Sequence, residues 1–311
     1  MTGSSIFGRV GYPFAGWPNI VDFVLSGLAG RSRNSSTRLT RPRPGSVRDH
    51  EIVTECVTLI TGASAGIGAE LARVFASKGH RVALTARRAD RLNALAAEIM
   101  TGGGAAPIII PCDLQQPDAG SKIATALAAE GVEVEYLVNN AGFGLFGGAI
   151  ELDCAEQLGI IAVNIYALTD LCLRFADSLV RHRGGILNVS SIAGFLPGPG
   201  MAVYYASKAY VLSLSEALRQ ELAPQGVRVT VLCPGVVPTE FQVRAGLKSG
   251  FDSVLLNVSP ANVAWAGYRG LMAGKRAVLP GFGIRLIPPL LRLFPRSFVL
   301  WAVDQVQFRK R

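Results

Sequence analysis

Short apolar runs alternate along the chain with longer segments in which apolar residues recur at helical spacing. The runs predict strands near 56–61, 81–86, 106–111, 134–139, 185–190, 227–232 and 276–280. The segments between them predict helices, the long ones near 66–78, 88–100, 118–130, 153–182, 202–223 and 260–273. Near-continuous apolar strands that alternate with helices are typical of a parallel sheet covered on both faces. The pattern therefore predicts an α/β fold, a single doubly wound domain with a parallel sheet of about seven strands.

A glycine-rich turn follows the first predicted strand and leads directly into a helix. Glycines let the backbone approach a pyrophosphate closely, and the free N–H groups and dipole of a helix N-terminus stabilise its charge. The spacing is Gly-x-x-x-Gly-x-Gly, which differs from the commonest dinucleotide fingerprint, Gly-x-Gly-x-x-Gly. A turn without a ligand is the alternative. The turn predicts a Rossmann-type dinucleotide site with the candidate residues Thr61, Gly62, Ser64, Ala65, Gly66, Ile67 and Gly68.

Tyr204 and Lys208 lie four residues apart on a predicted helix, on one face and one turn from each other. An ammonium at that distance favours the phenolate and lowers the pKa of the tyrosine, so that the phenol can exchange a proton near neutral pH. The hydroxyl of Ser191 could hydrogen-bond the oxygen on which charge develops. The neighbouring Tyr205 fits less well, because the residue four positions further on is Ala209. An ordinary helix surface can also carry such a pair.

Taken together, these motifs resemble those of the short-chain dehydrogenase/reductase family, in its branch with a Tyr-x-x-x-Lys active site. The resemblance covers residues 54–280, and the motifs occur in the family's order. It implies that Ser191, Tyr204 and Lys208 are catalytic. Tyr204 would donate a proton to a carbonyl oxygen that Ser191 also hydrogen-bonds, and Lys208 would lower the pKa of Tyr204. Asn164 matches the helix asparagine that holds a proton-relay water in the family.

The resemblance also implies a set of cofactor contacts. Asp113 matches the acid that contacts adenine, and the segment closing the fourth strand contributes Asn139, Ala141 and Gly142. The loop that contacts the nicotinamide carboxamide contributes Pro234, Gly235, Val237 and Thr239. Tyr204 and Lys208 complete the set, because Lys208 would hold the nicotinamide ribose.

The turn after the second strand indicates which dinucleotide binds. In dinucleotide folds an acidic residue there hydrogen-bonds the ribose 2′-hydroxyl, whereas a basic residue accommodates a 2′-phosphate. This chain has Ala86 in place of the acid, followed by Arg87 and Arg88. A guanidinium can grip a phosphate with two hydrogen bonds. The turn therefore favours NADP(H) over NAD(H), the alternative being two arginines on a solvated helix start.

The predicted function is an NADP(H)-dependent oxidoreductase that interconverts a ketone and a secondary alcohol. The loop 240–257 is expected to line the substrate pocket with Phe241, Leu247, Phe251, Leu255 and Leu256. These side chains favour an apolar or lipid-like small-molecule carbonyl, such as a 3-oxoacyl or steroid-like ketone. Two alternatives remain: a non-catalytic dinucleotide-binding sensor or scaffold, and an epimerase or dehydratase that uses the same Tyr and Lys.

Composition limits the other classes of function. At 311 residues the chain suits one catalytic domain, expected at 51–281, with extensions at 1–50 and 282–311. The net charge of +9 is carried by these extensions, so nucleic-acid binding by the catalytic domain is not expected. The five cysteines have no metal-ligand spacing and no disulfide pattern, so no metal is predicted. We expect a homo-oligomer, either a dimer or a tetramer.

The two extensions lead to different expectations. The segment 1–50 is rich in Ser, Gly and Arg and predicts a disordered extension, the alternatives being an organelle transit peptide and a misassigned start. The segment 282–311 places Phe294, Phe298, Leu300 and Trp301 among basic residues, which suits a helix at a membrane surface. The alternative is a cap over the substrate cleft or a dimer interface. The expected location is cytoplasmic with peripheral membrane contact, or an organelle if the first segment is a transit peptide.

Overall fold

A computed structural model of the chain describes residues 55–247, 258–291 and 293–308. The described residues belong to one compact unit, Ile52–Arg311. The predicted N-terminal extension lies outside the described residues, as do Phe251, Leu255 and Leu256 of the expected substrate loop. The boundary expected near residue 281 lies inside this unit, just before a helix that begins at Phe282, and stays a prediction.

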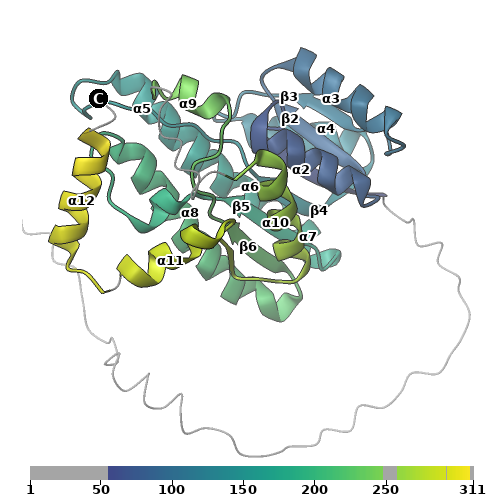
Figure 1. Cartoon of the computed structure of the whole chain (residues 1–311). Helices are drawn as coiled ribbons and strands as arrows, with labels where there is room; N and C mark the ends of the chain where they lie inside the picture. The colour runs from purple at the N-terminus through teal and green to yellow at the C-terminus, as the bar shows by residue number, and fades with distance from the viewer. Residues whose placement is uncertain (1–54, 248–257, 292, 309–311) are drawn as a thin grey trace, which may run out of the picture. The chain divides into compact units, whose positions relative to one another are not determined.

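Seven parallel strands form one sheet in the order β3-β2-β1-β4-β5-β6-β7 (Figure 1). They are β1 Glu55–Thr61, β2 Val82–Ala86, β3 Ile108–Pro111, β4 Val132–Asn139, β5 Gly185–Val189, β6 Arg228–Leu232 and β7 Ala277–Val278. The last strand is shorter than predicted and pairs at the edge of the sheet with β6 alone. The α/β fold with a seven-stranded parallel sheet, predicted from the apolar runs, is confirmed.

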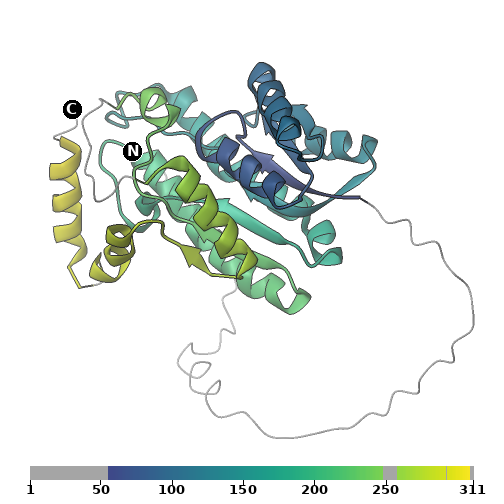
Figure 2. The same ribbon diagram turned by 45° about the vertical axis from the view of Figure 1, so that its right-hand side comes forward.

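Helices cover both faces of this sheet (Figures 1 and 2). One face packs against α2 Gly66–Ser77, α3 Ala89–Thr101 and α10 Pro260–Met272. The other packs against α4 Ala119–Ala129, α5 Cys154–Ile161, α6 Leu168–Arg174, α7 Ala176–Arg181 and α8 Ala202–Leu222. Successive strand residues enter opposite cores: Leu59 belongs to one and Ile60 to the other, both with 0% exposure. This period of two explains why strands buried on both faces appear as continuous apolar runs.

The helix predicted over 153–182 is not continuous. Between α5 and α6 the chain forms a π-helical segment, Ala162–Ala167, and Phe175 separates the end of α6 from the start of α7. By length and composition alone, the stretch Cys154–Arg174 could cross a bilayer. Here it covers the sheet and contributes Ile160 and Leu171, each 1% exposed, to the core. Widened turns of this kind frequently occur at functional sites, and this one contains Asn164.

The C-terminal segment forms two helices, α11 Phe282–Leu291 and α12 Arg296–Phe308. Pro288 and Pro289 lie inside α11, which ends two residues later, consistent with the backbone N–H groups that proline lacks. Ile284 of α11 is fully buried and Val299 of α12 is 9% exposed. Each helix therefore buries at least one apolar side chain.

Candidate active site

A cleft of about 490 Å³ opens where the parallel strands end. Six of the strands each contribute a lining residue one or two positions beyond the strand end. These residues are Gly62, Arg87, Cys112, Asn140, Ser190 and Pro234. The strand order changes direction between the neighbouring strands β1 and β4, and ligands of doubly wound folds bind at such a switch point. The volume lies in the range of small-molecule and cofactor sites.

The glycine turn is hydrogen-bonded to the residues after β4 and packs closely against them. The hydroxyl of Thr61 accepts hydrogen bonds from the backbone N–H groups of Asn140 and Ala141, both at 3.0 Å. Gly62 has a φ of +66°, and a Cβ there would lie 2.8 Å from the Cα of Ala141. A Cβ on Gly68 would overlap the carbonyl oxygen of Gly62. The sequence of small residues is therefore required by close backbone packing as well as by any ligand.

The geometry of this turn fits a pyrophosphate. Gly66, at the first position of α2, has a φ of +56°, and a Cβ there would lie 3.0 Å from the Thr239 side chain. The free N–H groups at the start of α2 and the neighbouring Arg88 favour an anion in the cleft.

Most of the predicted site residues line this one cleft. They are Gly62, Ser64, Ala65, Gly66, Ile67, Arg87, Arg88, Asp113, Ala141, Gly142, Ser191, Tyr204, Lys208, Pro234, Gly235, Val237 and Thr239. The predicted residues that do not line the cleft are Thr61, Gly68, Asn139 and Asn164.

Asn139 belongs to the core. As the last residue of β4 it is 2% exposed, and its amide donates to Asn188 Oδ1 at 2.9 Å and to Cys172 Sγ at 3.2 Å. Asn140 lines the cleft instead and donates from Nδ2 to the Thr61 carbonyl oxygen at 3.0 Å. The sequence did not distinguish the two neighbouring asparagines, because the choice depends on where the strand ends.

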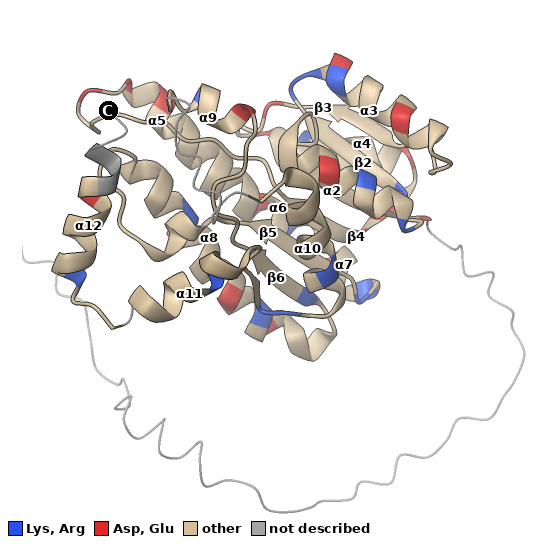
Figure 3. Ribbon diagram, in the orientation of Figure 1, with Lys and Arg blue, Asp and Glu red and all other residues tan. Residues whose placement is uncertain are grey.

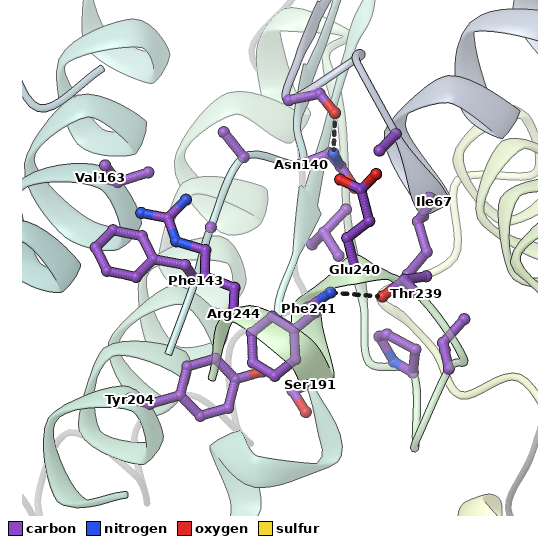
Figure 4. A pocket seen from close by; sticks show the side chains of 18 of the residues that line it. Ile67, Asn140, Phe143, Val163, Ser191, Tyr204, Thr239, Glu240, Phe241 and Arg244 are labelled. Atoms are coloured by element: carbon purple, nitrogen blue, oxygen red, sulfur yellow. Dashed lines mark hydrogen bonds between the residues drawn. The ribbon is translucent and has the colours of Figure 1, made fainter. Parts of the chain in front are cut away.

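Ser191, Tyr204 and Lys208 all line the cleft, and Figure 4 shows the side chains of Ser191 and Tyr204 in it. Ser191 follows β5 and begins a short 3-10 turn, Ile192–Phe195, whereas Tyr204 and Lys208 lie on α8. The Ser191 hydroxyl accepts from the Ala193 backbone N–H at 3.1 Å and lies near enough to the Tyr204 phenol to lower its pKa. Lys208 donates from Nζ to the Val189 carbonyl oxygen at 2.9 Å, and Nζ lies 5.8 Å from the centre of the Tyr204 ring.

Burial dominates the ionisation of this group. It raises the pKa of Tyr204 to about 12, against the lowering effect of the Ser191 hydrogen bond. It also lowers the pKa of Lys208 to about 8. The sequence-based expectation of a lowered Tyr204 pKa is therefore not met in this structure. At neutral pH the phenol is protonated, as a proton donor to a carbonyl oxygen must be.

Asn164 hydrogen-bonds the backbone of Phe143, which lines the cleft. Its Oδ1 accepts from the Phe143 backbone N–H at 3.2 Å, and its Nδ2 donates to the Phe143 carbonyl at 3.0 Å and to Ser207 Oγ at 2.9 Å. A Cβ on Gly142 would lie 3.0 Å from Asn164 Oδ1 and 3.2 Å from Lys208 Nζ. Asn164 and Lys208 thus approach the same point of the backbone, and the water relay between them stays a prediction.

A short helix, α9 Glu240–Arg244, covers part of the cleft and supplies contacts that the motifs did not indicate. The Phe241 ring lies 5.2 Å from the Tyr204 ring, and the Arg244 guanidinium lies 3.9 Å above the Phe143 ring (Figure 4). Glu240 accepts a hydrogen bond from Arg88. Phe241 and Leu247 were expected to line the pocket, and both do so.

A Cys–His–Glu chain lies elsewhere, near the start of β1 and β4. His182 Nδ1 is 3.4 Å from Cys56 Sγ, and Nε2 is 2.6 Å from Glu133 Oε2. The histidine positions in the sequence gave no indication of such a group. Burial and the carboxylates of Glu135, Glu133 and Glu55 raise the pKa of Cys56, so the thiolate needed for nucleophilic attack is disfavoured.

Comparison with known proteins agrees with this geometry. A family model described as short chain dehydrogenase matches residues 56–249. The chain is 40% identical over 199 residues to a sulfoacetaldehyde reductase of Chromohalobacter salexigens, covering 62% of this chain and 77% of the relative. It resembles a solved short-chain dehydrogenase from Sphingobium yanoikuyae in complex with NADPH, with a TM-score of 0.67, 35% identity and coverage of 72% and 87%. It also resembles a solved family member from Burkholderia phymatum in complex with NAD, with a TM-score of 0.66, 25% identity and coverage of 75% and 92%.

The chain belongs to the short-chain dehydrogenase/reductase family. It is an oxidoreductase that acts on alcohol or carbonyl groups and uses a dinucleotide cofactor. The family assignment made from the ordered motifs is thereby confirmed.

Proposed function

We propose that this enzyme uses NADP(H) to interconvert a ketone and a secondary alcohol. The observation that carries the proposal is that Ser191, Tyr204 and Lys208 line the same cleft as the glycine turn, with Lys208 Nζ 5.8 Å from the centre of the Tyr204 ring. A nicotinamide dinucleotide supplies or accepts the hydride when it is bound. The chain's own residues supply binding and the proton.

The roles of these residues follow from their protonation. In the reductive direction the protonated Tyr204 donates its proton to the substrate oxygen, and the Ser191 hydroxyl hydrogen-bonds that oxygen as its charge develops. The positive charge of Lys208 stabilises the phenolate that remains. Below its pKa of about 8, Lys208 is predominantly charged, which supports this role at neutral pH.

The preference for NADP(H) is supported by the turn after β2. Ala86 ends the strand without a carboxylate, and Arg87 and Arg88 both line the cleft. Arg88 also donates to Ser64 Oγ in the glycine turn at 3.2 Å, which directs its guanidinium toward the phosphate-binding backbone.

An apolar carbonyl compound is the proposed substrate class. The apolar side chains of Phe143, Met201, Phe241 and Leu247 line the cleft that contains Tyr204. A panel of ketones and aldehydes, from 3-oxoacyl and steroid-like to small polar compounds, tests this with NADPH and NADH consumption as the measurement. Turnover of apolar ketones with NADPH supports the proposal. Binding of NADPH without turnover of any compound would favour the sensor or scaffold alternative, and product formation without net NADPH consumption would favour an epimerase or dehydratase.

We also propose a cytoplasmic protein that contacts anionic membranes through its C-terminal helices. Phe294, Phe298 and Trp301 form a run of neighbouring rings and are 47–60% exposed. Most of α11 and α12 carries no charged side chain (Figure 3), and the sequence 275–311 contains eight Lys or Arg. Burial contributes about 1.5–3 kcal/mol per large apolar side chain, and each nearby Lys or Arg adds about 1 kcal/mol at an anionic surface.

Replacing Phe294, Phe298 and Trp301 with Ser tests this surface, and replacing the 99% exposed Ile150 with Ser is the control. We expect loss of co-sedimentation with phosphatidylserine vesicles in the triple variant alone. Failure of the unaltered protein to sediment contradicts the membrane proposal. Loss of oligomer in the triple variant would identify a second copy as the partner of this surface.

We further propose a homo-oligomer. Leu158, Tyr166 and Leu173, which lie on α5, the π-helical segment and α6, are exposed apolar side chains that a second copy could cover.

A further inference from the structure

Arg88 is already engaged before any phosphate binds. Its Nη2 donates to Glu240 Oε2 at 2.7 Å and to Ser64 Oγ at 3.2 Å. Glu240 is separated from Arg88 by 152 residues along the chain. The ion pair joins the turn after β2, where a 2′-phosphate is expected, to the first residue of α9, and both residues line the cleft. Both side chains are partly exposed, at 42% and 54%, so a ligand in the cleft can reach them.

We propose that Glu240 is a selectivity residue that competes with the 2′-phosphate of the cofactor for Arg88. This inference rests on the proposed use of NADP(H). A phosphate monoester carries about −1.5 to −2 charges at neutral pH and can take two hydrogen bonds from a guanidinium. It therefore displaces a carboxylate with one negative charge, but part of the binding free energy is spent on breaking the existing ion pair. A cofactor without the 2′-phosphate leaves the ion pair in place.

The local structure separates this role from a role in folding. Glu240 is the first residue of α9, but the cap of that helix is formed by its neighbours. Thr239 Oγ1 accepts from the Phe241 N–H at 3.3 Å, and the Thr239 N–H donates to Gln242 Oε1 at 2.9 Å. Neutralising Glu240 therefore leaves the capping bonds intact. The next residue, Phe241, lies 5.2 Å from the Tyr204 ring.

The test measures binding of two nucleotide fragments by calorimetry, 2′,5′-ADP and 5′-AMP, which differ only in the 2′-phosphate. For Glu240→Gln we expect 2′,5′-ADP to bind about two- to five-fold more tightly, as for an exposed ion pair, and 5′-AMP to bind unchanged. In an Arg88→Gln background the same change should have no effect, because Glu240 acts through Arg88. Glu216→Gln is the control, since Glu216 pairs with Arg276 and neither residue lines the cleft.

The outcomes separate this inference from the proposed cofactor preference. If the unaltered protein favours 2′,5′-ADP but Glu240→Gln leaves its affinity unchanged, the inference is overturned and the preference stands. If Glu240→Gln weakens 5′-AMP binding, Glu240 contacts the ribose hydroxyls and the inference is also overturned. If neither protein distinguishes the two fragments, both fail. If only Glu240→Gln favours 2′,5′-ADP, Glu240 offsets the contribution of Arg88 to 2′-phosphate binding in the unaltered protein. That result supports the inference and contradicts the proposed preference for NADP(H).

Discussion

Lys208 should make the folded protein less stable at neutral pH than an apolar residue would. Its side chain is 5% exposed, and its Nζ donates one hydrogen bond, to the Val189 carbonyl oxygen. Burial lowers its pKa from 10.5 to about 8. Folding therefore costs free energy whenever this lysine is charged, and the substitution Lys208→Met removes that cost together with the catalytic charge.

The magnitude follows from the pKa shift. A difference of one pKa unit corresponds to about 1.4 kcal/mol, so the shift of Lys208 corresponds to a cost of about 3 kcal/mol. Met leaves the Val189 carbonyl without its partner, which costs about 1–2 kcal/mol. We expect Lys208→Met to unfold with a free energy about 1–2 kcal/mol higher at pH 7, while carbonyl reduction falls to near background.

The pH dependence distinguishes this explanation from better packing. Below a pH of about 8, Lys208 is charged in the folded and unfolded states, and the full cost is present. Between about 8 and 10.5 the folded state loses the proton first, so the unfolded state binds more protons and stability rises with pH. The advantage of Lys208→Met should therefore shrink over this range. Urea unfolding at pH 7 and at pH 10 measures it, with substitution of the exposed Lys122 of α4 by Met as the control. A variant less stable than the unaltered protein at pH 7, with the same pH slope, would refute the reasoning.

Two further predictions concern the cleft. Tyr204→Phe should lower turnover at least about 100-fold while NADPH affinity stays nearly unchanged, because the phenol acts on the reacting oxygen; near-normal turnover would exclude Tyr204 as the proton donor. Replacing Ala86 with Asp and both Arg87 and Arg88 with neutral residues should shift the ratio of kcat/KM values toward NADH, because a 2′-phosphate would then face a carboxylate. A preference for NADH in the unaltered protein would show that the turn was misinterpreted.

Most of the fold could be predicted because each strand is marked by the residues of its own segment. Each central strand is buried on both faces, so its apolar run marks it within a few residues, as for β1 and β4. The short β7 and the π-helical segment were not predictable, because both depend on packing between distant segments. β7 has a single neighbouring strand, and the widened turn places Asn164 against the backbone of Phe143.

The candidate site was predictable where a residue's place depends on its own strand end. Gly62, Arg87 and Ser191 come one or two residues after strand ends and line the cleft as expected. Asn139 was misplaced because strand β4 includes it, which turns its side chain into the core. The pKa of Tyr204 could not be inferred from the spacing to Lys208, since burial of the phenol raises it.

The contacts of α9 explain how cofactor choice and catalysis could share one segment. Gly66 approaches the Thr239 side chain, and the following residues Glu240 and Phe241 reach Arg88 and Tyr204 respectively. Gly66 permits this approach because a Cβ would lie 3.0 Å from the Thr239 methyl group and its φ of +56° disfavours other residues. A side chain at position 66 would therefore displace both the ion pair that faces the ribose and the ring that faces the phenol. Any bulkier residue there should disturb selectivity and turnover together, although it touches neither Arg88 nor Tyr204.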